Sequence, residues 1–126
     1  MSTFLKLAAA VAALMLVTGA ASAQQYATYN DAYADLNNTA QREARAGMAD
    51  LDAMQQTDQS DAAICPYLGS ARQHFYAAND ALVSLIAYAR QEPNSGIEAQ
   101  AVKTQNMVVD YIDHINPVYE NHCKPA

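Results

Sequence analysis

The sequence predicts an all-α protein, a small up-down-up three-helix bundle. Its second and third helices are expected to form an antiparallel hairpin that is clipped by one disulfide. Glycine and proline are sparse, with four of each in 126 residues, and β-branched residues form no alternating run. Two long segments carry apolar residues at alternating spacings of three and four, which is the period of an amphipathic helix. This composition favours helices over strands.

Residues 1–23 are predicted to be a cleavable signal peptide. Lys6 supplies the positive charge, residues 7–17 are apolar, and Ala21, Ser22 and Ala23 provide small residues before the cleavage point. The apolar run is too short for a membrane-spanning helix, which needs about 20 residues. We therefore expect an exported bacterial protein, periplasmic or secreted, with no membrane anchor after cleavage. Residues 24–126 are long enough for a single helical-bundle domain.

The predicted mature chain is acidic. It keeps six of the seven basic residues and all thirteen acidic ones, which gives a net charge of −7. Nucleic acids and anionic lipid headgroups bind to clustered Lys and Arg side chains. The charge balance therefore argues against a nucleic-acid partner.

The second and third helices are indicated by two apolar seams. The first seam consists of Ile64, Leu68, Ala71, Phe75, Ala78, Leu82, Leu85 and Ala89, and the second of Ile97, Ala101, Thr104, Val108, Tyr111, Ile115 and Val118. Between them lies the turn sequence 92–96, in which Ser95 and Glu98 have the spacing of a capping box. A helix is thus expected to begin near Gly96. Two amphipathic helices joined by so short a turn should lie antiparallel, seam against seam.

The first helix is expected over residues 30–56, with a thinner apolar face. That face consists of Tyr29, Tyr33, Leu36, Ala40, Ala44, Met48, Leu51 and Met54. Gly47 should weaken this helix by about 1 kcal/mol relative to Ala. The polar residues 55–61 form a connection, or else Asp58 or Ser60 caps an early start of the second helix.

Two prolines give further expectations about the helix ends. Pro66 suits the first turn of the second helix, where a missing N–H group has no cost. Pro117 follows Asn116 and is expected to bend or end the third helix, leaving residues 118–123 as an irregular turn.

The two cysteines are expected to form a disulfide, because an even count in an exported chain usually means a bridge. Cys65 lies 29 residues before Asn94, at the centre of the turn, and Cys123 lies 29 residues after it. Residues equidistant from the turn of an antiparallel hairpin lie at the same height. The bridge should therefore clip the open end of the hairpin.

The same height rule applies to His74 and His114, each 20 residues from Asn94. With Asp110, one turn before His114, they could supply two nitrogens and an oxygen to a divalent metal. Glu43 of the first helix is a possible fourth ligand. The alternative is that these histidines face solvent or bond to a nearby carboxylate, since no tight metal motif such as H-E-x-x-H is present.

A haem site is a further alternative, in which Met48, Met54 or Met107 and either His114 or His122 would be the two ligands. No spacing selects one pair, and methionines at helical spacing are typical of a core. We therefore expect no cofactor.

A stripe of tyrosines at Tyr26, Tyr29 and Tyr33 is a candidate surface for a protein partner, which the sequence leaves unidentified. The alternative is that the rings are half-buried against the bundle. No serine, histidine or carboxylate pattern indicates hydrolytic catalysis, so we expect no enzyme. The sequence favours a non-enzymatic interaction or accessory factor of the bacterial envelope. Its alternative is a metal- or cofactor-binding bundle that uses His74 and His114.

Overall fold

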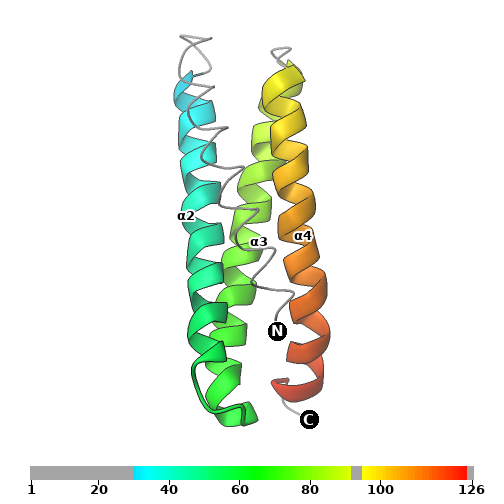
Figure 1. Cartoon of the computed structure of the whole chain (residues 1–126). Coiled ribbons are helices and arrows are strands. Elements are labelled where there is room, and N and C mark those ends of the chain that lie inside the picture. The colour runs from blue at the N-terminus through cyan, green and yellow to red at the C-terminus, as the bar shows by residue number, and fades with distance from the viewer. Residues whose placement is uncertain (1–29, 92–94, 125–126) are drawn as a thin grey trace.

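The computed structural model describes residues 30–91 and 95–124, and within these ranges the chain is helical with no strand. The helices are α2 (Asn30–Gln55), α3 (Asp61–Gln91) and α4 (Ser95–His122) (Figure 1). Helix α2 ends one residue before its predicted end and α4 begins one residue before Gly96, whereas α4 extends beyond its predicted end. The predicted signal peptide 1–23 and residues 92–94 of the predicted turn lie outside the described ranges.

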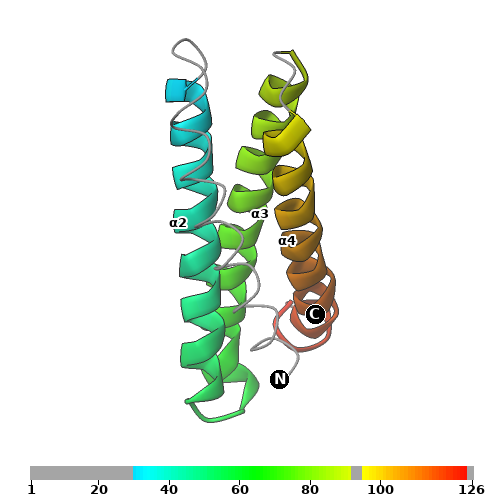
Figure 2. The same ribbon diagram turned by 45° about the horizontal axis from the view of Figure 1, so that its top comes forward.

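Helix α3 is the element that organises the bundle. It lies beside α2 and beside α4 in both views (Figures 1 and 2). The close backbone approaches between described helices are those of α3 with α2 and of α3 with α4. The buried residues of α3 therefore lie toward α2, toward α4 or in the seam between these two edges, whereas residues such as Asp80 are exposed to solvent.

The predicted seams of α3 and α4 form the core. Every residue of the α3 seam is buried, and so is every residue of the α4 seam except Val118, which is partly buried. Thr104 is the polar member of the α4 seam. Its hydroxyl donates a hydrogen bond of 3.0 Å to the carbonyl oxygen of Gln100, one turn earlier. This local bond lets a hydroxyl group lie in an apolar seam without an unpaired donor.

The buried face of α2 differs from the predicted one at two positions. Asn37 and Gly47 are buried, whereas Leu36 and Met48 are only partly buried and pack against the edge of the core. The observed face keeps a strict alternation of four and three residues, which the apolar residues alone do not follow. It consists of Tyr33, Asn37, Ala40, Ala44, Gly47, Leu51 and Met54. Packing against α3 thus selects positions by geometry as well as by side-chain hydrophobicity.

The start of α3 is fixed by Ser60. The Ser60 Oγ accepts a hydrogen bond of 3.3 Å from the N–H of Ala63, as an N-cap residue does. Of the two candidate caps, Ser60 is therefore the one used. Pro66 was predicted to lie in the first turn of the second helix. This prediction is wrong, because α3 begins at Asp61 and Pro66 lies further inside the helix.

The prediction that Pro117 ends the third helix and leaves residues 118–123 as an irregular turn is wrong, because α4 continues to His122. The alternative, that Pro117 bends the helix, stays a prediction. A proline removes one helical hydrogen bond, and the residues that follow it here are anchored on α3. The Tyr119 ring contacts the Arg72 side chain, and Cys123 is covalently bound to α3. These two contacts hold the last turns of α4 in place.

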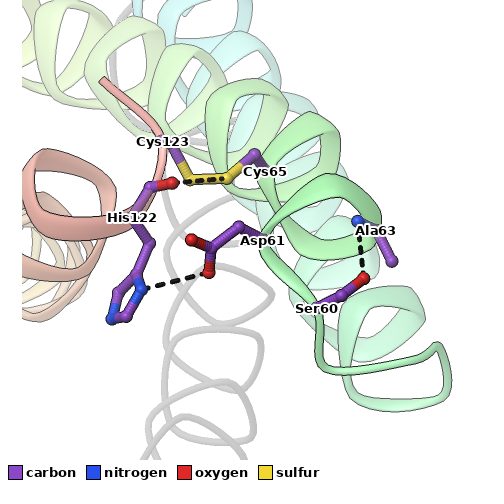
Figure 3. The surroundings of a disulfide bond; sticks show 6 residues. All are labelled: Ser60, Asp61, Ala63, Cys65, His122 and Cys123. Carbon is purple, nitrogen blue, oxygen red and sulfur yellow. Dashed lines mark hydrogen bonds and ion pairs between the residues drawn. A yellow bond between two sulfur atoms is a disulfide. The ribbon is translucent and has the colours of Figure 1, made fainter. Parts of the chain in front are cut away.

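The Cys65–Cys123 disulfide is present, as predicted, and joins α3 to α4 (Figure 3). The two Cα atoms are 5.4 Å apart, within the usual range for a bridge. The Cys65 Sγ lies 3.4 Å from the carbonyl oxygen of His122. The His122 ring points toward Asp61, with 3.1 Å between His122 Nδ1 and Asp61 Oδ1 (Figure 3). The bridge and this surface contact therefore both join the N-terminal end of α3 to the C-terminal end of α4.

One layer of the core joins all three helices through an aromatic stack. The rings of Phe75 and Tyr111 are parallel within 6° and their centroids are 4.6 Å apart. On its α2 side the Phe75 ring lies against the backbone of Gly47, where an added Cβ would come within 2.8 Å of two ring carbons. Gly47 thus makes room for the ring.

The variant Gly47→Ala is expected to lower the free energy of unfolding by about 1–3 kcal/mol, because the new methyl group overpacks the core against Phe75. Alanine is the better helix former by about 1 kcal/mol, so propensity alone predicts the opposite sign. Gly69→Ala is the matched control. An added Cβ there lies 3.7 Å from the Tyr119 ring, an ordinary contact, and should leave stability unchanged or raise it. Urea unfolding of both variants measures the difference, and equal effects would contradict the packing argument.

Removal of the disulfide is expected to lower the free energy of unfolding by about 4 kcal/mol, because the bridge closes a long loop in the unfolded chain. The bridged residues are 58 positions apart in sequence. Denaturant titrations of the oxidised protein and of the Cys65→Ala/Cys123→Ala double variant give the difference. A loss below about 1 kcal/mol would show that the bridge is not a main source of stability.

Burial raises the pKa of Tyr111 well above its ordinary value of 10.0. The unfolded chain therefore releases this proton at a lower pH than the folded chain, and stability should fall as the pH rises above 10. Below that pH the contribution is fully present. The free energy of unfolding should decline less steeply between pH 9 and 11 for Tyr111→Phe than for the wild type. Equal slopes would show that ionisation of Tyr111 does not limit alkaline stability.

Candidate functional site

His74 lies on the edge of α3 that faces α2. Its Nδ1 is 2.6 Å from Oε2 of Glu43, and its Nε2 is 3.9 Å from Oδ2 of Asp50. Glu43, which the sequence offered as a possible fourth ligand, does bring its carboxylate to His74. Both ring nitrogens of His74 face carboxylates of α2, and the side chain ties α3 to α2.

His114 is exposed on α4, and its Nδ1 lies 2.7 Å from the carbonyl oxygen of Asp110. Among the described residues, no group of three or more His, Cys, Asp or Glu side chains could hold a metal ion. The structure therefore does not gather His74, His114 and Asp110 into a metal site. Equal distance from Asn94 is not sufficient, because His74 lies on the edge of α3 that faces α2.

The tyrosine stripe divides between the core and the undescribed part of the chain. Tyr33 is fully buried, and its hydroxyl donates a hydrogen bond of 3.3 Å to the carbonyl oxygen of Tyr88. Tyr33 is thus a core residue and not part of an exposed partner surface. Tyr26 and Tyr29 lie outside the described residues.

The polar contacts between α3 and α4 lie along a second row of residues beside the core seams. The row repeats the alternation of three and four, and we call it the α3–α4 strip. On α3 it contains Cys65, Arg72, Tyr76, Asn79, Val83, Ile86 and Arg90, and on α4 it contains Glu98, Val102, Gln105, Asn116, Tyr119 and Cys123. The disulfide closes one end of the strip, and an ion pair of 3.4 Å between Arg90 and Glu98 lies at the other.

The most ordered part of the strip is a cluster of Arg72, Tyr76, Asn116 and Tyr119, which we call the arginine–tyrosine cluster. The Arg72 guanidinium carbon lies 5.3 Å from the Tyr76 ring centroid and 4.9 Å from that of Tyr119. Both distances are those of cation–π contacts. The guanidinium group is therefore held by two aromatic rings, one from each helix.

The side-chain amide of Asn116 completes this cluster. Its Oδ1 accepts a hydrogen bond of 2.8 Å from Arg72 Nε, and its Nδ2 donates one of 2.9 Å to the Tyr76 hydroxyl oxygen. The Tyr119 ring lies over Gly69. A Cβ added to Gly69 would be 3.7 Å from the Cε2 atom of this ring. Each member of the cluster is thus fixed by at least one other.

No carboxylate among the described residues pairs with Arg72. Arg90, by contrast, has Glu98 as its partner. Arg42 and Arg45 of α2 also have no carboxylate partner among the described residues, but unlike Arg72 they are exposed. Arg72 is partly buried and its positive charge is not neutralised within the described chain. The cluster thus presents a fixed cation on a protein whose net charge is −6.

Further along the strip the surface becomes apolar. A hollow of about 350 Å³ is lined by Val83, Ile86, Ala87, Arg90, Val102 and Gln105. Val83 is 50% exposed and Tyr76, seven residues earlier on α3, is 39% exposed. Asn79 and Gln105 lie between the hollow and the cluster and share a hydrogen bond of 3.2 Å. One continuous face therefore offers a cation, tyrosine rings and an apolar hollow.

This face was not predicted, although the sequence holds a signal for it. A second row with the same heptad spacing runs beside each core seam, and it holds Arg72, Tyr76 and Tyr119. Histidines and the tyrosines of the first helix suggest chemistry when taken singly, whereas the residues of this row do so only together.

Within residues 30–91 and 95–124, no helical segment has the length and apolar character that a membrane span requires.

Comparisons of the chain with protein-family models, with curated proteins and with solved structures found no match.

Proposed function

We propose that the mature chain is a non-enzymatic interaction protein of the bacterial envelope, which binds a protein partner through the α3–α4 strip. The observation that carries this proposal is the arginine–tyrosine cluster. Its cation is held in place by two rings and an amide, yet it has no acidic partner among the described residues. A surface cation that is held in a fixed position, and is not neutralised by a described carboxylate, is suited to contact another molecule.

The residue types of the cluster support a protein partner. Arginine and tyrosine are enriched among the few interface residues that carry most of the binding energy. Because the Arg72 side chain is already held by Tyr76, Asn116 and Tyr119, little of its rotamer entropy remains to be lost on binding. The cluster is thus suited to act as a preorganised contact.

The apolar part of the strip adds the second element that interfaces use. Interface cores are apolar and are surrounded by polar residues. Val83 and the hollow beside it provide apolar surface, and the Arg90–Glu98 pair lies at its border. The proposed partner therefore carries an apolar side chain that fills this hollow.

The up-down-up arrangement, export and cleavage after Ala23 belong to the same proposal. Support for an antiparallel hairpin comes from contacts between residues equidistant from Asn94, such as Arg72 with Asn116. The disulfide is consistent with an oxidising compartment such as the periplasm. In this proposal the bridge keeps the two halves of the strip in register outside the cytoplasm.

The proposal predicts site-specific crosslinking to a partner in cells. With the photoreactive residue p-benzoylphenylalanine at Val83, we expect one crosslinked product in the envelope of the source bacterium. Tyr76→Ala should weaken that product strongly, since loss of an interface tyrosine often costs about 2 kcal/mol or more. The matched control carries the crosslinker at Asn38, which is exposed on α2. Equal products from Val83 and Asn38, or no product from Val83, would refute the proposed surface.

A further inference from the structure

We infer that the arginine–tyrosine cluster is a binding site for a single carboxylate, supplied by an acidic side chain of the partner. This inference rests on the proposed function and specifies its chemistry. Its basis is the hydrogen-bonding capacity of Arg72. A guanidinium group has five N–H donors in a planar fork and accepts none. In the described chain only Nε donates a hydrogen bond, to Asn116, so the four N–H groups on the two terminal nitrogens are left for a ligand.

The geometry of the cluster restricts which ligand fits. The two tyrosine rings lie against the guanidinium group, and Asn116 takes up its Nε position. The terminal nitrogens remain as a pair of donors. Two parallel N–H groups match the two oxygens of one carboxylate in a bidentate contact. The rings also keep water from part of the guanidinium group, which strengthens the contact relative to a fully solvated pair.

The charge of the whole protein favours a carboxylate over a phosphate. The chain has a net charge of −6, so an approaching anion is repelled in proportion to its own charge. A carboxylate carries one negative charge, whereas a phosphate group carries about 1.5 to 2 at neutral pH. One fixed arginine offsets one negative charge and not two. Within the chain, Arg90 also pairs with a carboxylate, and there its Nε lies 3.4 Å from Oε2 of Glu98.

The inference is tested by NMR titration of the oxidised protein at constant ionic strength. The probes are the α-amide of N-acetylglutamate, the α-amide of N-acetylglutamine and inorganic phosphate. The signals followed are the Arg72 Nε–H group and the rings of Tyr76 and Tyr119. We expect the glutamate derivative to shift all three and to saturate, and the neutral glutamine derivative to shift none of them.

Two variants distinguish a site that requires the guanidinium fork of Arg72 from non-specific electrostatic attraction of the anion. Arg72→Lys keeps the charge but loses the fork, and should weaken binding about tenfold or more, since a hydrogen bond to a charged group is worth about 1.5–3 kcal/mol. Asn116→Asp leaves Arg72 in place but gives it a carboxylate within the chain, and should also reduce binding. Arg42→Lys, at an exposed arginine on α2, is the matched control and should bind as the wild type does. Circular dichroism verifies that each variant is folded.

Three results would overturn the inference: equal shifts from the glutamine derivative, tighter binding of phosphate than of carboxylate, or unchanged binding by Arg72→Lys. Failure of this inference is distinguishable from failure of the proposed function. If Val83 crosslinks a partner while the probe does not bind, the partner uses another chemistry and only the carboxylate site is refuted. If the probe binds while Val83 crosslinks nothing, the site exists and the proposed partner surface is refuted.

Discussion

The Phe75 ring lies where α2, α3 and α4 share one layer, and the space it fills exists because residue 47 has no side chain. On one side the ring contacts the backbone of α2, and on the other it stacks on Tyr111 of α4. Large side chains dominate the burial energy of a small core. Because one ring contacts both neighbouring helices, α2 and α4 are both set relative to α3, and the two edges of α3 acquire separate roles.

The edge of α3 toward α2 carries His74, whose ring faces Glu43 and Asp50. The edge toward α4 carries Arg72 with its tyrosines and amide, together with the disulfide. The same register that places Phe75 in the core therefore directs His74 and Arg72 to opposite edges. This division explains why two histidines equidistant from Asn94 do not form a metal site with Asp110 among the described residues. In the proposed function, the α3–α4 edge is the partner surface because Arg72 there has no carboxylate partner among the described residues.

Much of the fold could be predicted from the sequence because heptad spacing and helix ends are local properties. The seams of α3 and α4 follow from residues a few positions apart. Ser60 was one of two candidate caps, and the structure selects it. The disulfide was expected for a second reason, since both cysteines are 29 residues from Asn94. The helix does not end at Pro117, because contacts with α3 on its C-terminal side outweigh the local effect of the proline.

The sequence by itself determined that the described chain is helical, that the predicted seam residues of α3 and α4 are buried except for Val118, and that Cys65 pairs with Cys123. Only the tertiary structure decided the rest: that Asn37 and Gly47 are buried in place of Leu36 and Met48, that Tyr33 is a core residue, and that Arg72 is held between two rings. The physical reason is the same in each case. Helical periodicity fixes the direction in which a side chain leaves the axis of its helix. Which residue that side chain contacts depends on how the helix packs against its neighbour.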